Sequence, residues 1–190
     1  MKGCRPLTEN EVDLLVKSFA GKFAKRDKAL FLLGTKSGFR ISELLSLRVG
    51  DVVQHGHMVN QVTVKRRNMK KKIEGRSVIL HPDAKAAIAD WLNTIEYGND
   101  TFIFRSRKAE NRPISRRQAL RIFRGIYDAN ELSGKLGTHT LRKTFADRIY
   151  EKSDRDLAKT QRALGHKNIN STISYLDFKQ EDIDTLILGI

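Results

Sequence analysis

The sequence predicts a mainly helical α+β domain with a small three-stranded antiparallel sheet. Apolar residues recur at helical spacing through most of the 190 residues, whereas period-two alternation is confined to one region that starts at Met58. A chain of this length suits one domain with its own core. Residues 1–190 are therefore expected to form a single domain.

Two helices are predicted at the N-terminus. Thr8 and Glu11 have the spacing of a capping box, and apolar residues from Val12 to Phe19 follow at helical spacing. A basic turn from Lys22 to Lys28 should separate this helix from a second, largely buried helix over Ala29 to Thr35.

The second helix is predicted to stop before Gly38, which places Arg40 at a corner. Ser42 opens the next helix, and apolar residues on both sides would hold the Arg40 guanidinium at the edge of the core. The alternative is a surface arginine that caps a turn.

The period-two region predicts a β-hairpin. Residues from Met58 to Val64 alternate like a strand, and Ser77 to Leu80 form a returning strand. Between them lies a dense basic turn, Lys65 to Lys72. Thr101 to Phe104 is a short apolar run that is predicted as a third strand or an extended segment.

Two further helices are predicted before the C-terminal third. His81 and the proline after it start one helix, and Ser115 begins a second capping box. Arg116, Arg117 and Arg121 fall near the start of that second helix, where amide groups and basic side chains can both hold phosphate. We expect them to contact a nucleic-acid backbone without reading bases.

The stretch from Thr138 to Tyr175 carries the residues most suited to chemistry. Thr138 is a candidate N-cap, and His139 and Arg142, three positions apart, share a helix face. His166 follows a glycine that ends the next helix, and Tyr175 lies nine residues later. Alone, His166 would suit a structural role and Tyr175 half-buried packing. Their order and spacing together predict a phosphate site with a nucleophile.

Composition points to a polyanion as partner. The chain has 36 basic and 22 acidic residues, a net charge of +14, and nucleic acid is the simplest partner for it. The single cysteine, Cys4, excludes an internal disulfide framework and fits a reducing cytoplasm. Scattered histidines and the lack of a cysteine pair predict no metal site, and no nucleotide-binding loop or membrane span is expected.

These motifs resemble the tyrosine recombinase (phage integrase) family over nearly the whole chain, from about Leu7 to about Ile183. Four segments carry the resemblance: Gly38-Phe39-Arg40-Ile41-Ser42-Glu43-Leu44, His139-x-x-Arg142, Leu164-Gly165-His166, and Tyr175. The resemblance implies the fold of a tyrosine recombinase catalytic domain. It also implies a site-specific DNA recombinase that needs no cofactor, and that cleaves and rejoins strands through a covalent 3′-phosphotyrosine.

The resemblance also implies a role for each residue. Arg40 and Arg142 would hold phosphate oxygens, since a guanidinium matches them with paired N–H groups. Tyr175 would be the nucleophile, His139 the general base and His166 a hydrogen-bond donor to the phosphate.

A hairpin lysine would be the general acid. Counting back from the returning strand places Lys70 in this role, counting forward from Arg40 places Lys65, and the length of the basic run leaves Lys71 as a third candidate. Lys65, Arg66 and Arg67 are predicted as DNA contacts.

Double-stranded DNA is the expected partner, and the resemblance implies a tetramer on paired DNA sites, with the apolar tail over residues 181–190 as a docking element. The location expected is the cytoplasm, at the nucleoid. The helical core-binding domain common in the family is missing from this chain, so the sequence is either truncated or a minimal recombinase. A non-catalytic DNA-binding relative and a type IB topoisomerase-like enzyme are the alternatives.

Overall fold

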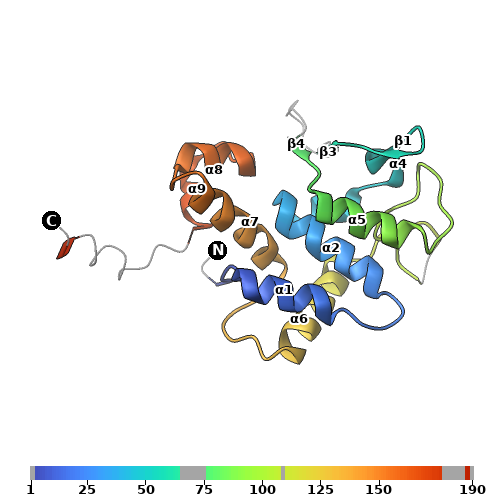
Figure 1. Ribbon diagram of the computed structural model, residues 1–190, viewed down its shortest axis with the longest axis horizontal. Coiled ribbons are helices and arrows are strands. Elements are labelled where there is room, and N and C mark those ends of the chain that lie inside the picture. The colour runs from blue at the N-terminus through green and yellow to red at the C-terminus, as the bar shows by residue number, and fades with distance from the viewer. Residues whose placement is uncertain (1–2, 65–75, 108–109, 177–186, 189–190) are drawn as a thin grey trace.

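The computed structural model describes residues 3–64, 76–107, 110–176 and 187–188. The described chain is mainly helical with short antiparallel ladders, which confirms the predicted fold class (Figure 1). Its elements are, in order, α1 (Glu9–Ser18), α2 (Ala24–Ser37), α3 (Ile41–Ser46), α4 (Val49–Val52), β1 (Val53–Gln54), β2 (His57–Met58), β3 (Gln61–Val64), β4 (Arg76–Ile79), α5 (Pro82–Leu92), α6 (Arg116–Ala129), α7 (Thr138–Lys152), α8 (Leu157–Leu164) and α9 (Ile169–Ile173).

Helix α2 runs through the centre of the main body and packs against α5 and α7. Residues 29–35 are all buried, as expected of a helix that is apolar on every side. Helix α2 begins at Ala24, earlier than predicted, so part of the predicted basic turn is helical. Arg26 tolerates burial there because it lies over the Phe23 ring and pairs with Asp27.

The two predicted hairpin strands form with shifted bounds: the first is β3, which begins at Gln61 because Met58 belongs to β2, and the returning strand is β4, Arg76–Ile79. β3 pairs antiparallel with β4, from Gln61 opposite Ile79 to Val64 opposite Arg76. Val62 and Val64 are buried, whereas Gln61 and Thr63 face solvent. The predicted basic turn, Lys65 to Lys72, falls within residues 65–75, which lie outside the described part of the chain.

The sheet is divided differently from the predicted three strands. Among the described residues, β1 pairs with β2 and β3 with β4, as two separate ladders. The segment predicted as a third strand bonds to the chain around α3 and α4 instead. The Val49 N–H donates to the Thr101 carbonyl at 2.8 Å, and the Ile103 N–H donates to the Leu47 carbonyl at 3.1 Å.

The helix starts agree with the capping signals, with one exception. The Thr8 hydroxyl accepts from the Glu11 N–H, and Ser115 caps α6 in the same way. Thr138 as the N-cap of α7 was wrong: Thr138 is already helical, and Gly137 precedes the helix. The Thr140 hydroxyl, at the third helical position, accepts from the Gly137 N–H at 3.0 Å and so fixes Gly137 as the residue that precedes the helix.

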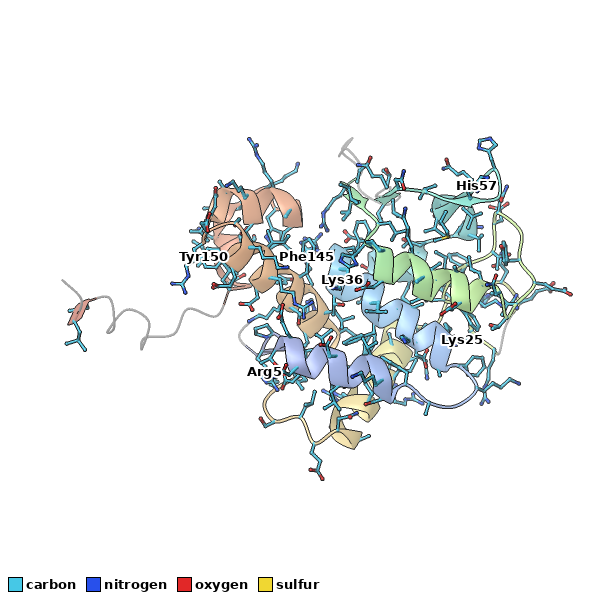
Figure 2. All side chains as sticks on the ribbon, in the orientation of Figure 1. Arg5, Lys25, Lys36, His57, Phe145 and Tyr150 are labelled. Atoms are coloured by element: carbon cyan, nitrogen blue, oxygen red, sulfur yellow. The ribbon has the colours of Figure 1, made fainter. Side chains whose placement is uncertain are left out.

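A second, smaller apolar cluster lies at the far end of α7. Its buried members are Phe145, Ala146, Leu164 and Leu176. We call this cluster, together with α8 and α9, the C-terminal lobe, and we call the part of the protein built around the larger apolar core the main body. Figure 1 shows α8 and α9 gathered at one end of α7, apart from α1, α2 and α5. Figure 2 labels Phe145 and Tyr150 on α7; Phe145 belongs to this cluster and Tyr150 packs against it.

In the described ranges, no helix combines the length and the apolar character that crossing a bilayer requires.

Candidate active site

The corner after α2 is held by a glycine and a carboxylate. Gly38 has φ +60°, and a Cβ there would collide with the Phe145 ring, so glycine is required twice over. Two residues on, Arg40 precedes α3. The Glu43 carboxylate accepts from the Arg40 N–H at 2.6 Å and pairs with its guanidinium at 3.1 Å. The Arg40 side chain is still 36% exposed, so it can meet a ligand.

Arg142 ties this corner to the C-terminal lobe. Its side chain is buried, and its guanidinium donates to the Gly38 carbonyl and, at 2.9 Å, to the Leu164 carbonyl. Burial and then the nearby charge of Arg40 lower the pKa of Arg142 to about 10, so it remains a cation at neutral pH. The buried Nε–H of Arg142 has no acceptor among the described residues. A buried donor of this kind fits an anionic ligand oxygen.

His166 is fixed through both ring nitrogens. Gly165, at φ +63°, ends α8, and the His166 ring then lies with Nε2 2.8 Å from an Arg142 nitrogen and Nδ1 3.0 Å from the Thr172 hydroxyl. A guanidinium can only donate, so Nε2 accepts and the proton resides on Nδ1. Burial, followed by the charges of Arg142 and other arginines, lowers the pKa of His166 to about 4. The ring is therefore neutral in this structure.

Tyr175 faces these residues from the segment after α9. Its hydroxyl lies 3.4 Å from His139 Nδ1, and its ring lies 5.5 Å from the Arg142 guanidinium carbon and 5.3 Å from the His166 ring. Burial and then the charge of Arg142 lower the pKa of His139, which keeps this ring neutral at pH 7. A neutral imidazole next to a phenol can accept its proton.

The structure therefore brings together five of the six residues predicted as catalytic: Arg40, His139, Arg142, His166 and Tyr175. The sixth, Lys70, lies outside the described residues, as do the alternatives Lys65 and Lys71 and the predicted DNA contacts Arg66 and Arg67. The described ends of the hairpin strands do lie close to the corner, because the Arg76 guanidinium donates to the carbonyls of Ser37 and Gly38.

Arg116 and Arg117 are exposed in the first turn of α6. A cavity of about 550 Å³ lies near the same end of the helix, and its lining includes Arg107, Arg112 and Arg121. Sequence analysis had singled out only Arg121 of these three, because Arg107 and Arg112 precede the helix and carry no periodic signal.

Two contributors to the site were missed in the sequence. Thr172 orients His166, and Arg76 bridges the corner to the last turn of α8. Neither belongs to a recognisable motif, and only the tertiary contacts reveal them. The described residues contain no group of three or more histidine, cysteine, aspartate or glutamate side chains arranged to hold a metal ion.

The sequence matches the phage integrase family over residues 5–181. A probable integrase/recombinase, YoeC of Bacillus subtilis, is 33% identical over 177 residues, covering 93% of this chain and 91% of that protein. The tyrosine recombinase XerC of Caldanaerobacter subterraneus is 27% identical over 89% of this chain and only 46% of its own length. The chain thus spans most of one relative and about half of the other.

Solved structures show the same fold. The crystal structure of XerA recombinase superposes with a TM-score of 0.77 at 21% identity, over 100% of this chain and 66% of that one. The XerH site-specific recombinase, in a post-cleavage complex with its palindromic difH substrate, gives a TM-score of 0.72 at 23% identity, over 96% and 51% of the two chains. The family match over residues 5–181 and the 33% identity to YoeC establish that the chain belongs to the phage integrase family.

Proposed function

We propose that this chain is a site-specific DNA recombinase that cleaves and rejoins strands through a phosphodiester bond to Tyr175. The observation that carries the proposal is the convergence of the Tyr175 hydroxyl, His139 and two arginines on one partly open corner. The relatives named above are recombinases and an integrase, and one neighbour was solved with cleaved DNA.

The first step is an in-line attack on phosphorus. The Tyr175 oxygen forms the new P–O bond as His139 takes its proton, and the bond from phosphorus to the 5′-oxygen of the next nucleotide breaks. The strand then carries a 3′-phosphotyrosine, and the leaving strand carries a 5′-hydroxyl. Because the phosphodiester is conserved in the tyrosyl bond, a 5′-hydroxyl of another strand can reverse the step without an energy source.

The arginines stabilise the transition state in this scheme. Arg40 approaches the phosphate from the exposed side of the corner, and the unpartnered Nε–H of Arg142 donates to a non-bridging oxygen. His166 can donate from Nε2 only after a proton reaches that nitrogen. The negative phosphate favours this change: burial and then the arginine charges hold the ring neutral, and the phosphate offsets those charges.

We assign the proton for the leaving 5′-oxygen to Lys70, with Lys65 and Lys71 as the alternatives. A substrate with a bridging sulfur at the 5′ position leaves without protonation, so it should restore cleavage to Lys70→Ala but not to Tyr175→Phe. Rescue of Lys65→Ala or Lys71→Ala, with normal cleavage by Lys70→Ala, would move the acid to that position.

DNA contacts outside the corner come from the basic surface. Arg116 and Arg117 would bind backbone phosphates together with the arginine-lined cavity beside α6, and Lys65, Arg66 and Arg67 would do so from the hairpin. We further propose that residues 1–190 act as one catalytic domain in the cytoplasm, at the nucleoid. Paired sites would assemble four copies, with residues 181–190 as the docking segment. Of that segment only Ile187 and Leu188 are described, and both are exposed.

A strand-transfer assay tests the proposal. Nicked duplexes with a randomised centre are incubated with the protein, so that cleavage releases a short 5′-hydroxyl fragment and traps the strand on the protein. A second duplex with a labelled 5′-hydroxyl strand is then added. Joining of trapped strands to the second duplex supports a recombinase, and sequencing the joined strands gives the preferred site.

Two other outcomes favour the alternatives. Retention of DNA with no covalent product from any sequence would favour the non-catalytic binder. A protein that only binds DNA has no need of a histidine next to the hydroxyl of a half-buried tyrosine, which is why we rank this alternative second. Relaxation of supercoiled circles without transfer between duplexes would favour the topoisomerase-like activity.

A further inference from the structure

Arg76 is the first described residue after the basic turn, and it reaches from β4 to the C-terminal lobe. Its guanidinium donates to the Ser37 carbonyl at 2.6 Å and to the Gly38 carbonyl at 3.2 Å, both in the main body. The same guanidinium donates to the Ala163 carbonyl in the last turn of α8. One side chain therefore bonds to both parts of the protein.

The surroundings of Arg76 fix its path. The guanidinium carbon lies 5.0 Å from the centre of the Phe39 ring and 5.8 Å from that of Phe145. Its stem passes Gly165 so closely that a Cβ on Gly165 would lie 2.9 Å from Arg76 Cδ. The glycine that ends α8 thus also makes room for the arginine.

Few other contacts connect the described residues of the lobe to the body. Its apolar cluster is separate from the main core, and α8 packs mainly on α7 and α9. Two arginine side chains donate to carbonyls at the end of α8 among the described residues: Arg142, on α7, donates to Leu164, and Arg76, from β4 in the body, donates to Ala163. These two carbonyls come immediately before Gly165 and His166. Their position determines where His166 and Tyr175 stand relative to Arg40.

The charged form of Arg76 is energetically unfavourable at this position. It is largely buried, and no ion pair to a carboxylate is formed by it within the described ranges. Burial and then the charge of Arg142 lower its pKa to about 10. Desolvation beside like charges opposes the cation, and the three carbonyl acceptors, which lie in both the body and the lobe, offset that cost.

We infer that Arg76 is a positioning residue, which holds the C-terminal lobe and Tyr175 in place against the Arg40 corner. The inference rests on the proposed function for its chemical consequence, although the clamp itself can be observed without DNA. Arg76 does not need to touch the scissile phosphate for this role.

Three variants separate clamping from charge and from stability. Arg76→Met removes the guanidinium and retains an apolar stem between the rings. Arg76→Lys keeps the charge, but its side chain is one atom shorter, so its nitrogen falls short of the position of Nη2, which donates to both the Ser37 and the Ala163 carbonyls, and it lacks the second nitrogen that donates to Gly38. Arg48→Met is the matched control, because Arg48 also lies over a ring, that of Phe102 at 4.6 Å, and donates to the Asp100 carbonyl at 2.8 Å, entirely within the body.

The experiment combines amide hydrogen exchange of the free protein with single-turnover formation of the covalent adduct at saturating DNA. We expect faster exchange over residues 157–176 in both Arg76 variants, with the α2 and α5 amides unchanged. The rate of adduct formation should fall on the order of 100-fold in both, with little change in DNA affinity. Arg48→Met should show neither effect.

Three results would overturn the inference. One is unchanged exchange over residues 157–176 in both Arg76 variants. Another is a wild-type rate of adduct formation in Arg76→Lys together with a large loss in Arg76→Met, which would mean that charge at the phosphate is what matters. The third is an equal loss in Arg48→Met. If the wild-type chain forms no adduct at all, the proposed function fails, and the exchange measurement still decides whether Arg76 clamps the lobe.

Discussion

At the scale of single residues, Arg142 has two tasks that most side chains do not combine. It bonds to carbonyls of the body and of the lobe and sets the tautomer of His166, yet it leaves Nε–H without a described acceptor. The sequence identified Arg142 by its spacing from His139. It could not show the tautomer of His166, because that depends on contacts with Arg142 and with Thr172 across the fold.

The two arginines should therefore respond differently to truncation. Arg40→Ala should slow cleavage by about 100- to 1,000-fold through loss of a transition-state contact, with stability changed by no more than about 1 kcal/mol. Arg142→Ala should lose cleavage to at least the same degree and also several kcal/mol of stability, because buried carbonyls lose their donor. Single-turnover cleavage and urea unfolding measure both effects. An Arg142→Ala protein as stable as wild type would contradict the described bonding.

Acid should destabilise the fold through His166. Its folded pKa of about 4 lies below the unfolded value of about 6.5, so the unfolded state binds the proton more readily. Stability is complete above pH 6.5 and declines as pH falls towards 4, by on the order of 1 to 2 kcal/mol, since the ring is half exposed and solvent screens the effect. Urea unfolding between pH 7 and 4 should show a smaller decline in His166→Asn. The control is His57→Asn, which replaces an exposed histidine on β2. Its loss of stability over the same pH range should equal that of the wild type.

At the scale of elements, capping residues and terminal glycines predicted several helix ends, although not the start of α2 at Ala24 or the N-cap of α7 at Gly137. Long-range contacts decided the rest. The capping residues Thr8 and Ser115 and the terminal glycines Gly38 and Gly165 act within a few residues, so the sequence contains their whole signal. The segment 101–104 depends on a partner far away in the chain, and its bonds to the α3–α4 region could not be predicted from its own apolar pattern.

The Gly38 corner should be the element most sensitive to a small change. Gly38→Ala meets a left-handed backbone and the Phe145 ring together, whereas Gly56→Ala meets a positive φ of +79° in open space. The control should lose about 1 to 2 kcal/mol, and Gly38→Ala should lose a further 1 to 3 kcal/mol, roughly, from overpacking. Thermal or urea unfolding compares the two. Equal losses would show that Phe145 yields to the added methyl group.

At the scale of the whole molecule, the chain is basic and has two apolar clusters, and the corner from Gly38 to Arg40 lies where the two clusters meet. The charge of +14 was readable from composition, and it predicts a polyanion partner whatever the fold. The division into body and lobe was not readable, because the apolar residues of α7 show no break in periodicity where one cluster gives way to the other.

DNA affinity should fall steeply with salt. Phosphate contacts release counterions, so the logarithm of the association constant should decline linearly with the logarithm of salt concentration. Arg116→Gln combined with Arg117→Gln should reduce the slope by about 2, whereas the exposed pair Lys17→Gln and Lys152→Gln, on α1 and α7, should leave it unchanged. Fluorescence anisotropy over a salt series measures the slope. Equal slopes for the two double variants would place the DNA elsewhere.

The central claim is that Tyr175 is the nucleophile, and mapping the protein–DNA bond tests it most directly. The adduct trapped on nicked duplex is digested with protease, and mass spectrometry locates the residue that carries the nucleotide. We predict a 3′-phosphotyrosine at Tyr175, no adduct from Tyr175→Phe with DNA retention preserved, and a normal adduct from Tyr97→Phe, which alters an exposed tyrosine. A nucleotide on any other residue, or an adduct that persists in Tyr175→Phe, would contradict the account.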